Sequence, residues 1–308
     1  SLPGHLSGRP FLGEKRSDPV QYLFLSSDRS DNGIDMVRTV TDGKYLYSRN
    51  FMPFIPEVRY IRYMEIGEIK QQMRRDLKEN KLNALQKSLF ENRPAEFLFD
   101  VENDIWEIEN LAENPSYRDV LENMRTLLHD EIIKARDVML LPEYESGILP
   151  DSTTAYEFRL TDINFPVADI YDAAGISGFR SDEIARQQID LLSNSNKIIR
   201  YWAILGLRSQ TSEVLKPLSE EIIKAMDDPY PPVSVTASAI AWEFFNNKIA
   251  EEKLKLFCLA DDPNIALMTV NYLLYSSNKT PFIETIRKAR LKESNPYHVK
   301  VACMDFLG

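Results

Sequence analysis

A repeat in the second half of the chain constrains the fold more than any other feature. Four segments resemble one another, at residues 194–209, 227–244, 261–276 and 294–308. Their equivalent positions are Ala203, Ala237, Val270 and Cys303, which lie 34, 33 and 33 residues apart. Units of this length bury their apolar faces only by stacking on one another. The repeat therefore predicts an all-α solenoid of stacked helices over residues 179–308.

An Asx-Pro pair stands at the same point in three of the four segments. These pairs are Asp228-Pro229, Asp262-Pro263 and Asn295-Pro296. An Asp or Asn side chain caps the free amides at a helix start, and proline fixes φ at a helical value. The pattern resembles HEAT-type repeats, but the period is shorter than theirs usually is, so other helical repeats stay open.

The first half has the apolar spacing of strands at residues 20–27, 36–40, 44–50 and 95–100, and we expect the first of these to be buried. Asp42-Gly43 predicts a hairpin with a type I′ turn, which needs positive φ at both central residues. Residues 66–90 are mostly helical in pattern, with Asn83 as a cap. A long amphipathic helix is predicted from Tyr117, after Asn114 and a proline. This order predicts an α+β unit, a small antiparallel sheet covered by one long helix.

Residues 136–175 have no sustained period and contain three prolines. We interpret this stretch as a connecting segment. The predicted domains are therefore residues 1–143 for the α+β unit, 144–178 for the linker and 179–308 for the helical repeats.

The net charge of the chain is −10, from 37 Lys and Arg against 47 Asp and Glu. Binding to nucleic acid relies on Lys and Arg releasing counterions from phosphate, so this balance argues against a nucleic-acid partner. Cys258 and Cys303 lie far apart and indicate no disulfide scaffold. No apolar run approaches the ~20 residues that cross a bilayer, and no signal segment is recognisable.

Several stretches of the first half follow one another in a distinctive order. They are LPGHLSGRPFLG at 2–13, SSDRSDNGIDMVRTVTDGKYLYSRNFMP at 26–53, PAEFLFDVENDIWEIENLAENPSY at 94–117, and then the long helix. Together they resemble the C-terminal subdomain of the type I, formylglycine-dependent sulfatases, closest to the heparan N-sulfatase-like branch. Phe99 and Ile105 depart mildly from the family's usual Tyr and Pro. The resemblance covers about residues 10–143 and implies that subdomain's fold.

The resemblance also implies where the chemistry lies. Sulfatases hydrolyse sulfate esters or sulfamates with a formylglycine made from a C/S-x-P/A-x-R motif, assisted by calcium. Neither Cys258 nor Cys303 stands in such a motif. The formylglycine and the calcium ligands are therefore expected upstream of Ser1. We expect no catalytic residue, metal ligand or cofactor within this chain, which would not turn over substrate alone.

Four residues are candidates for contact with a sulfated glycan: Asp28, Arg29, Arg49 and Asn50. The planar guanidinium of arginine matches sulfate and carboxylate groups. The resemblance places the Asp28-Arg29 loop near the rim of the sulfatase cleft. The alternatives are a local ion pair at the strand end, and an Asn side chain that bonds to nearby backbone.

Other residues are better explained by structure. Arg38, within a strand, is predicted to form a structural ion pair. Trp202 and Trp242 lie at apolar repeat positions and are predicted to be core, whereas Trp106 stays open as a sugar-stacking residue. The three histidines lack a second ligand at metal-binding spacing.

Two hypotheses follow. The favoured one is the C-terminal part of a sulfatase acting on sulfated glycans, which forms one wall of the cleft and contacts its own catalytic domain. A protein partner for the repeats and a periplasmic or extracellular location, typical of the family, belong to this view. The alternative is an interaction scaffold, in which helical repeats are fused to a small α+β unit without a catalytic role.

Overall fold

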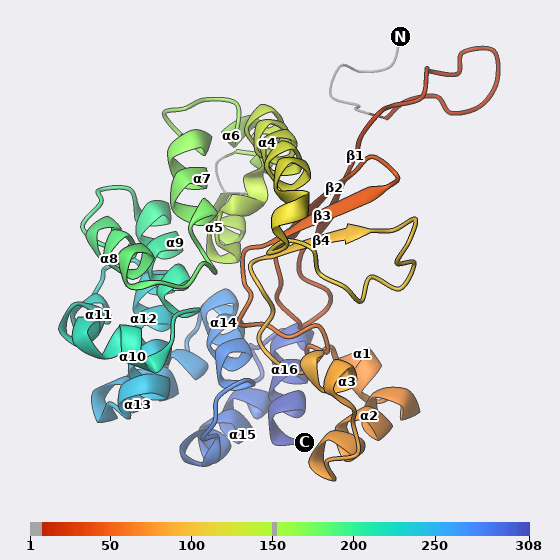
Figure 1. The fold of residues 1–308 in the computed structure, drawn as a ribbon. Coiled ribbons are helices and arrows are strands. Elements are labelled where there is room, and N and C mark those ends of the chain that lie inside the picture. Colours follow the sequence, from red (N-terminus) through yellow and green to blue (C-terminus); the bar gives the residue numbers. More distant parts are fainter. Residues whose placement is uncertain (1–7, 150–152) are drawn as a thin grey trace.

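The predicted strands form one four-stranded antiparallel sheet in the computed structural model, which describes residues 8–149 and 153–308 (Figure 1). The strands are β1 (Leu23–Ser27), β2 (Val37–Thr41), β3 (Tyr45–Asn50) and β4 (Glu96–Asp100), in that spatial order. Val40 pairs with Tyr47, and Tyr47 pairs with Leu98, so these three side chains share one face. The opening stretch at residues 2–13 lies partly outside the described residues.

The β2–β3 hairpin is confirmed, but its turn is not type I′. Of the two central residues of the turn, Asp42 and Gly43, only Gly43 has a positive φ, of 94°. Asp42 instead accepts hydrogen bonds through its side chain from the amides of Lys44 at 2.9 Å and Tyr45 at 2.7 Å. This local bond replaces the backbone geometry that the dipeptide alone predicts.

One face of the sheet is covered by α4 (Arg118–Ala135), the predicted long helix. Its apolar stripe of Leu121, Met124, Leu128 and Ile132 is buried in the same core as the sheet's inner face. A 3-10 turn at Pro115–Tyr117 precedes the helix, and the Asn114 side chain caps it by accepting from the amide of Ser116. The sheet and this helix form the expected α+β arrangement.

The edge strand β1 corrects the sequence prediction of a buried strand. All five of its residues are exposed, and Leu23, Phe24 and Leu25 are 58%, 41% and 52% exposed. The apolar sequence is typical of a covered strand, but none of the described residues covers β1. The prediction of a buried strand is therefore wrong.

Between β3 and β4 the chain forms three short helices, α1 (Arg62–Glu65), α2 (Glu68–Lys78) and α3 (Ala84–Ser88). Asn83 caps α3 as predicted, in a reciprocal capping box with Gln86. Gly67 and the residues before Asn83 interrupt what the sequence predicted as a nearly continuous helical stretch.

In its described residues the predicted linker, 144–178, is largely helical. It includes α6 (Ala155–Phe158), α7 (Val167–Gly175) and all of α5 (Glu143–Ile148) except its first residue. Phe165 and Ile170 within it are almost fully buried. A single hydrophobic core runs through all three predicted domains, so this segment joins them by packing. The domain boundaries themselves stay a prediction.

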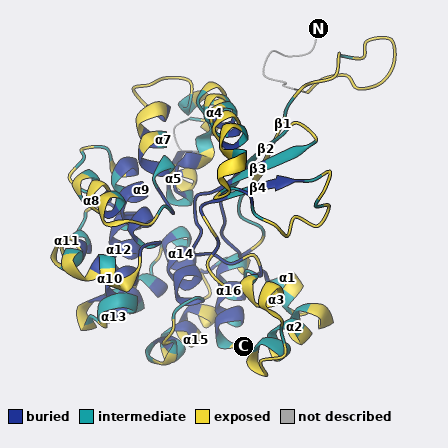
Figure 2. Cartoon of the chain, in the orientation of Figure 1, coloured by how far each residue is buried: buried dark blue, intermediate teal, exposed yellow. Residues whose placement is uncertain are grey.

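The second half is helical throughout, as predicted. Its helices are α8 (Asp182–Leu191), α9 (Lys197–Leu207), α10 (Ser212–Leu215), α11 (Ser219–Ala225), α12 (Pro231–Phe245), α13 (Lys248–Cys258), α14 (Pro263–Leu273), α15 (Ile283–Leu291) and α16 (Tyr297–Leu307). The helices of the four similar segments form a row in which α9 contacts α12, α12 contacts α14 and α14 contacts α16. Figure 2 shows this row as mainly buried, with exposed residues on α8, α11 and α13.

The four equivalent repeat positions, Ala203, Ala237, Val270 and Cys303, are all fully buried. The Asx-Pro signal, in contrast, is confirmed as a cap only at Asp262, which accepts from the amides of Asn264 and Ile265. In the segment before it, α12 begins two residues beyond the Asp-Pro pair. In the last segment the side-chain amide of Asn295 donates to a carbonyl of α15 instead.

The row of helices is joined to the first half by polar bonds as well as by the core. Asp305 of α16 accepts from the side chain of Asn32 at 2.8 Å and pairs with Arg62 at 3.1 Å. The Asn271 side chain of α14 accepts from the amide of Ile34 at 3.4 Å. Among the described residues, no helix is both long and apolar enough to cross a membrane.

Candidate functional site

Asp28 and Arg29 lie in a tight loop directly after β1. The loop is closed by two main-chain hydrogen bonds between Ser30 and Gly33, of 3.0 and 2.9 Å. A side chain at Gly33 would place its Cβ 2.6 Å from the carbonyl oxygen of Tyr60, so this close approach requires glycine. The loop thereby fixes the backbone from which both candidate side chains project.

Arg29 is held by a two-pronged ion pair with Glu143 at the start of α5. Its Nε lies 2.6 Å from Oε1 and its Nη2 lies 2.5 Å from Oε2 of Glu143. Its Nη1 donates to the carbonyl of Asn32 at 2.9 Å. All three nitrogens of the guanidinium are thus engaged within the chain, across 114 residues of sequence.

Asp28 belongs to a second cluster around Arg38 of β2. Arg38 contacts Asp28 at 3.0 Å and Asp137 at 2.5 Å, which confirms the structural ion pair predicted for it. Burial raises the pKa of Asp28, since it opposes the charged carboxylate more strongly than Arg38 favours it. The pKa of Arg38 is raised because its two carboxylates outweigh its own burial.

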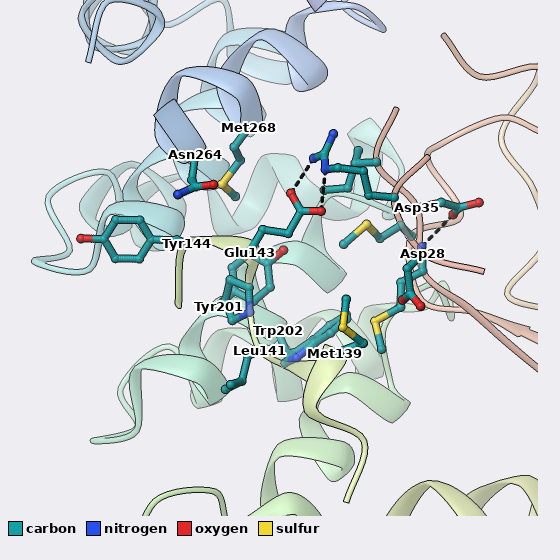
Figure 3. A pocket seen from close by; sticks show the side chains of 15 residues that line it. Asp28, Asp35, Met139, Leu141, Glu143, Tyr144, Tyr201, Trp202, Asn264 and Met268 are labelled. Carbon is teal, nitrogen blue, oxygen red and sulfur yellow. Dashed lines mark hydrogen bonds and ion pairs between the residues drawn. The ribbon is translucent and has the colours of Figure 1, made fainter. Parts of the chain in front are cut away.

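A small cavity lies between these two clusters and the helices (Figure 3). Its apolar lining includes Met139, Leu141, Tyr201, Trp202 and Met268, which Figure 3 labels around the Glu143 carboxylate. The volume is about 30 Å³. That is room for about two water molecules, far less than a small-molecule site of roughly 300–1,000 Å³.

The chemistry available here is limited by how fully the charges are paired. His298 of α16 lies within electrostatic reach of Arg29 and Glu143, and its pKa is lowered by burial and by Arg29. The neutral imidazole is therefore favoured beside an arginine that already has a carboxylate. The arrangement ties the end of β1 to α5 and offers no anion an unpaired cation in this conformation.

Arg49 and Asn50 lie elsewhere, at the end of β3, and the structure does not bring them to the Asp28-Arg29 loop. Arg49 is 2% exposed and donates to carbonyls of Asn50, Ala95, Gly175 and Ser177. Asn50 is 1% exposed and donates to the carbonyl of Pro94 at 2.8 Å. Both side chains have a structural role here, and glycan contact by them stays a prediction.

A polar cluster that the sequence did not indicate lies at one end of the sheet's open face. Asp35 binds Arg93 in a two-pronged pair of 2.5 and 3.2 Å and also pairs with Arg59. These three residues line a groove of about 570 Å³. Trp106, which is 78% exposed, lines the same groove. No local motif marks the cluster, because Asp35 lies just before β2 whereas Arg59 and Arg93 lie in the connection between β3 and β4.

Candidate nucleophiles and metal ligands give no second site within residues 8–149 and 153–308. No group of three or more His, Cys, Asp or Glu side chains could hold a metal ion there. Cys258 and Cys303 are buried and unpaired. Burial raises the pKa of both thiols, to about 12 for Cys303, so neither is a thiolate at neutral pH.

No protein-family model matches the chain. Among curated proteins, the chain is 34% identical over 142 residues to the Ulvan-active sulfatase of Formosa agariphila. The alignment covers 46% of this chain and 24% of that protein, so the chain spans about a quarter of the length of the relative that it matches. Part of the chain is therefore sulfatase-related.

Proposed function

We propose that this chain is the C-terminal part of a sulfatase that hydrolyses sulfate esters or sulfamates of glycans. The observation that carries the proposal is the 34% identity to a sulfatase over 142 residues. The small antiparallel sheet with α4 on one face is compatible with a sulfatase C-terminal subdomain. In this proposal the formylglycine and calcium belong to a catalytic domain that precedes the chain, outside the cytoplasm.

The open side of the sheet is where we propose that this catalytic domain docks. The edge strand β1 is exposed on both faces, and Ile105 and Trp106 beside the open face are 72% and 78% exposed. An uncovered apolar edge strand invites pairing and aggregation, and native proteins usually cover it. A companion domain on this side would cover these side chains and turn the groove near Trp106 into one wall of a substrate cleft.

We propose that the helical half is a HEAT-like array that supports this wall. The row α9–α12–α14–α16 and the buried equivalent positions favour a repeat architecture. A lysine bond to the end of an earlier helix also occurs in two successive units, although the lysines stand at different positions of the repeat. Lys253 donates to the carbonyl of Met226 at 2.9 Å, and Lys292 donates to the carbonyls of Leu259 and Ala260, each at 2.9 Å. Each lysine stabilises the C-terminal end of an earlier helix in the stack.

The test is the polypeptide encoded ahead of Ser1. We expect it to contain a C/S-x-P/A-x-R motif, and mass spectrometry of the complete protein should detect formylglycine at the first position of that motif. The scaffold alternative predicts neither the motif nor the modified residue, and their absence would contradict the sulfatase proposal.

A further inference from the structure

Cations line one face of α2. Lys70, Arg74 and Lys78 are spaced four residues apart, which places them on one side of the helix. Arg74 pairs with Glu65 at 2.8 Å, and Lys70 lies 3.7 Å from the same carboxylate. Lys78 is exposed, and no carboxylate of the described residues forms an ion pair with it. The stripe thus has three cations for one carboxylate.

A fourth cation faces this stripe from the other half of the chain. Lys279 lies directly before a 3-10 turn at Thr280–Phe282, and its Nζ is 5.3 Å from the ring centre of Tyr60 and 5.4 Å from that of Phe306. The charged groups that act on it are Arg74 and Lys78. Burial, and then these two cations, lower the pKa of Lys279 to about 8.

The ring of Tyr60 holds Arg74 and Lys279 in place, and of these two cations only Arg74 is also paired with a carboxylate of the described residues, that of Glu65. The Arg74 guanidinium carbon lies 3.8 Å from the ring centre of Tyr60, so Arg74 and Lys279 share that ring. Ring faces attract cations but carry no net charge. Asp305, which acts on the neighbouring Glu65, is already paired with Arg62. Together, α2, Glu65 and Lys279 carry five cations and three carboxylates, and in a chain of net charge −10 this surplus of two positive charges is a local exception.

Like charges in such a cluster repel one another, and an anion bound between the cations would relieve this repulsion. We propose that Lys78 and Lys279, beside the Glu65-paired Arg74, form a binding site for the sulfate groups of a sulfated polysaccharide, at the junction of α2 with the α14–α15 loop. The site joins the two halves of the chain, so a bound polyanion would contact both. The proposed function enters only in the choice of sulfate as the anion, because the charges and distances stand without it.

The experiment is calorimetric titration of this chain with dextran sulfate at two salt concentrations. The test variant is the double substitution Lys78→Gln and Lys279→Gln. The matched control, Lys216→Gln with Lys224→Gln, removes the same charge from exposed lysines of the second half. We expect the test variant to lose at least about tenfold in affinity and the control to lose less than about twofold. The slope of log affinity against log salt should fall by about one for each lysine removed at the site.

Further arms identify the source of the anion. Unsulfated dextran should not bind, and sodium sulfate should bind much more weakly than the polymer. In the wild type, NMR of methylated lysines should show the pKa of Lys279 rising when dextran sulfate binds. Equal losses in the test and control variants, equal binding of free sulfate, or tighter binding of single-stranded DNA would each overturn the assignment. The assay needs no catalytic domain, so its failure would leave the proposed function standing.

Discussion

Replacing Arg38 by methionine tests whether Asp28 belongs to a structural cluster. Arg38 has a side-chain exposure of 6% and is the shared partner of Asp28 and Asp137, whose side chains are 24% and 15% exposed. Removing one member of a buried pair costs about 3–5 kcal/mol, because the partner charge stays buried without compensation. Since both carboxylates keep some access to water, we expect a loss near the lower end, about 3 kcal/mol.

Urea denaturation followed by circular dichroism measures this loss. It should depend on pH, because the orphaned carboxyls can become neutral in acid. Burial already raises the pKa of Asp28, so the folded state binds a proton there more readily than the unfolded state does. The penalty of Arg38→Met should therefore be largest near pH 7 and shrink as the pH falls toward 4.

A triple variant, Arg38→Met with Asp28→Asn and Asp137→Asn, provides the matched control. It removes the repelling charges together with their cation, so most of the lost stability should return. A loss of less than about 1 kcal/mol in Arg38→Met, with no dependence on pH, would refute the structural assignment of Asp28.

Three further predictions concern buried polar groups. Burial opposes the charged form of Glu96, but hydrogen bonds from Arg125 and a tyrosine hydroxyl outweigh it, so its pKa is lowered. The stability that ionised Glu96 contributes is therefore present above its ordinary pKa of 4.5 and lost as the pH falls through the folded-state value. Glu96→Gln should lower the free energy of unfolding by about 1 kcal/mol at pH 7 and make it depend less on pH in acid. Trp202→Phe removes a 2.8 Å hydrogen bond to a main-chain carbonyl and part of a buried ring, and thermal melts should show a loss of about 2 kcal/mol. Cys258 and Cys303 should react with a thiol reagent only in urea, and rapid labelling of the native chain would contradict their burial.

Local signals in the sequence predicted elements well where a short stretch decides the outcome. The hairpin at Asp42, the cap at Asn83 and the core positions of Trp202 and Trp242 are all confirmed. By contrast, the turn at residues 30–33, which follows Arg29, depends on a distant contact. Position 33 must be glycine because a Cβ there would clash with the carbonyl oxygen of Tyr60, 27 residues further on.

Contacts between distant parts of the chain could not be predicted in this way. Arg49 bonds to carbonyls near the end of α7, 126 and 128 residues further on, so nothing beside it in the sequence indicates its burial. Arg29 likewise meets Glu143, which lies 114 residues further along the chain. The prediction of a buried strand at β1 is wrong for a related reason. An apolar sequence favours burial, but burial depends on what lies against the strand, and all five residues of β1 are exposed.

The proposed division of labour between this chain and a preceding domain is tested most directly by the release of inorganic sulfate. The substrates are sulfated glycan oligosaccharides, and the samples are this chain alone and the complete protein in which it occurs. The account predicts sulfate release by the complete protein and none above background by residues 1–308 alone. Turnover by the isolated chain would contradict the account, because it would place the reacting groups among the residues that we assign to the wall.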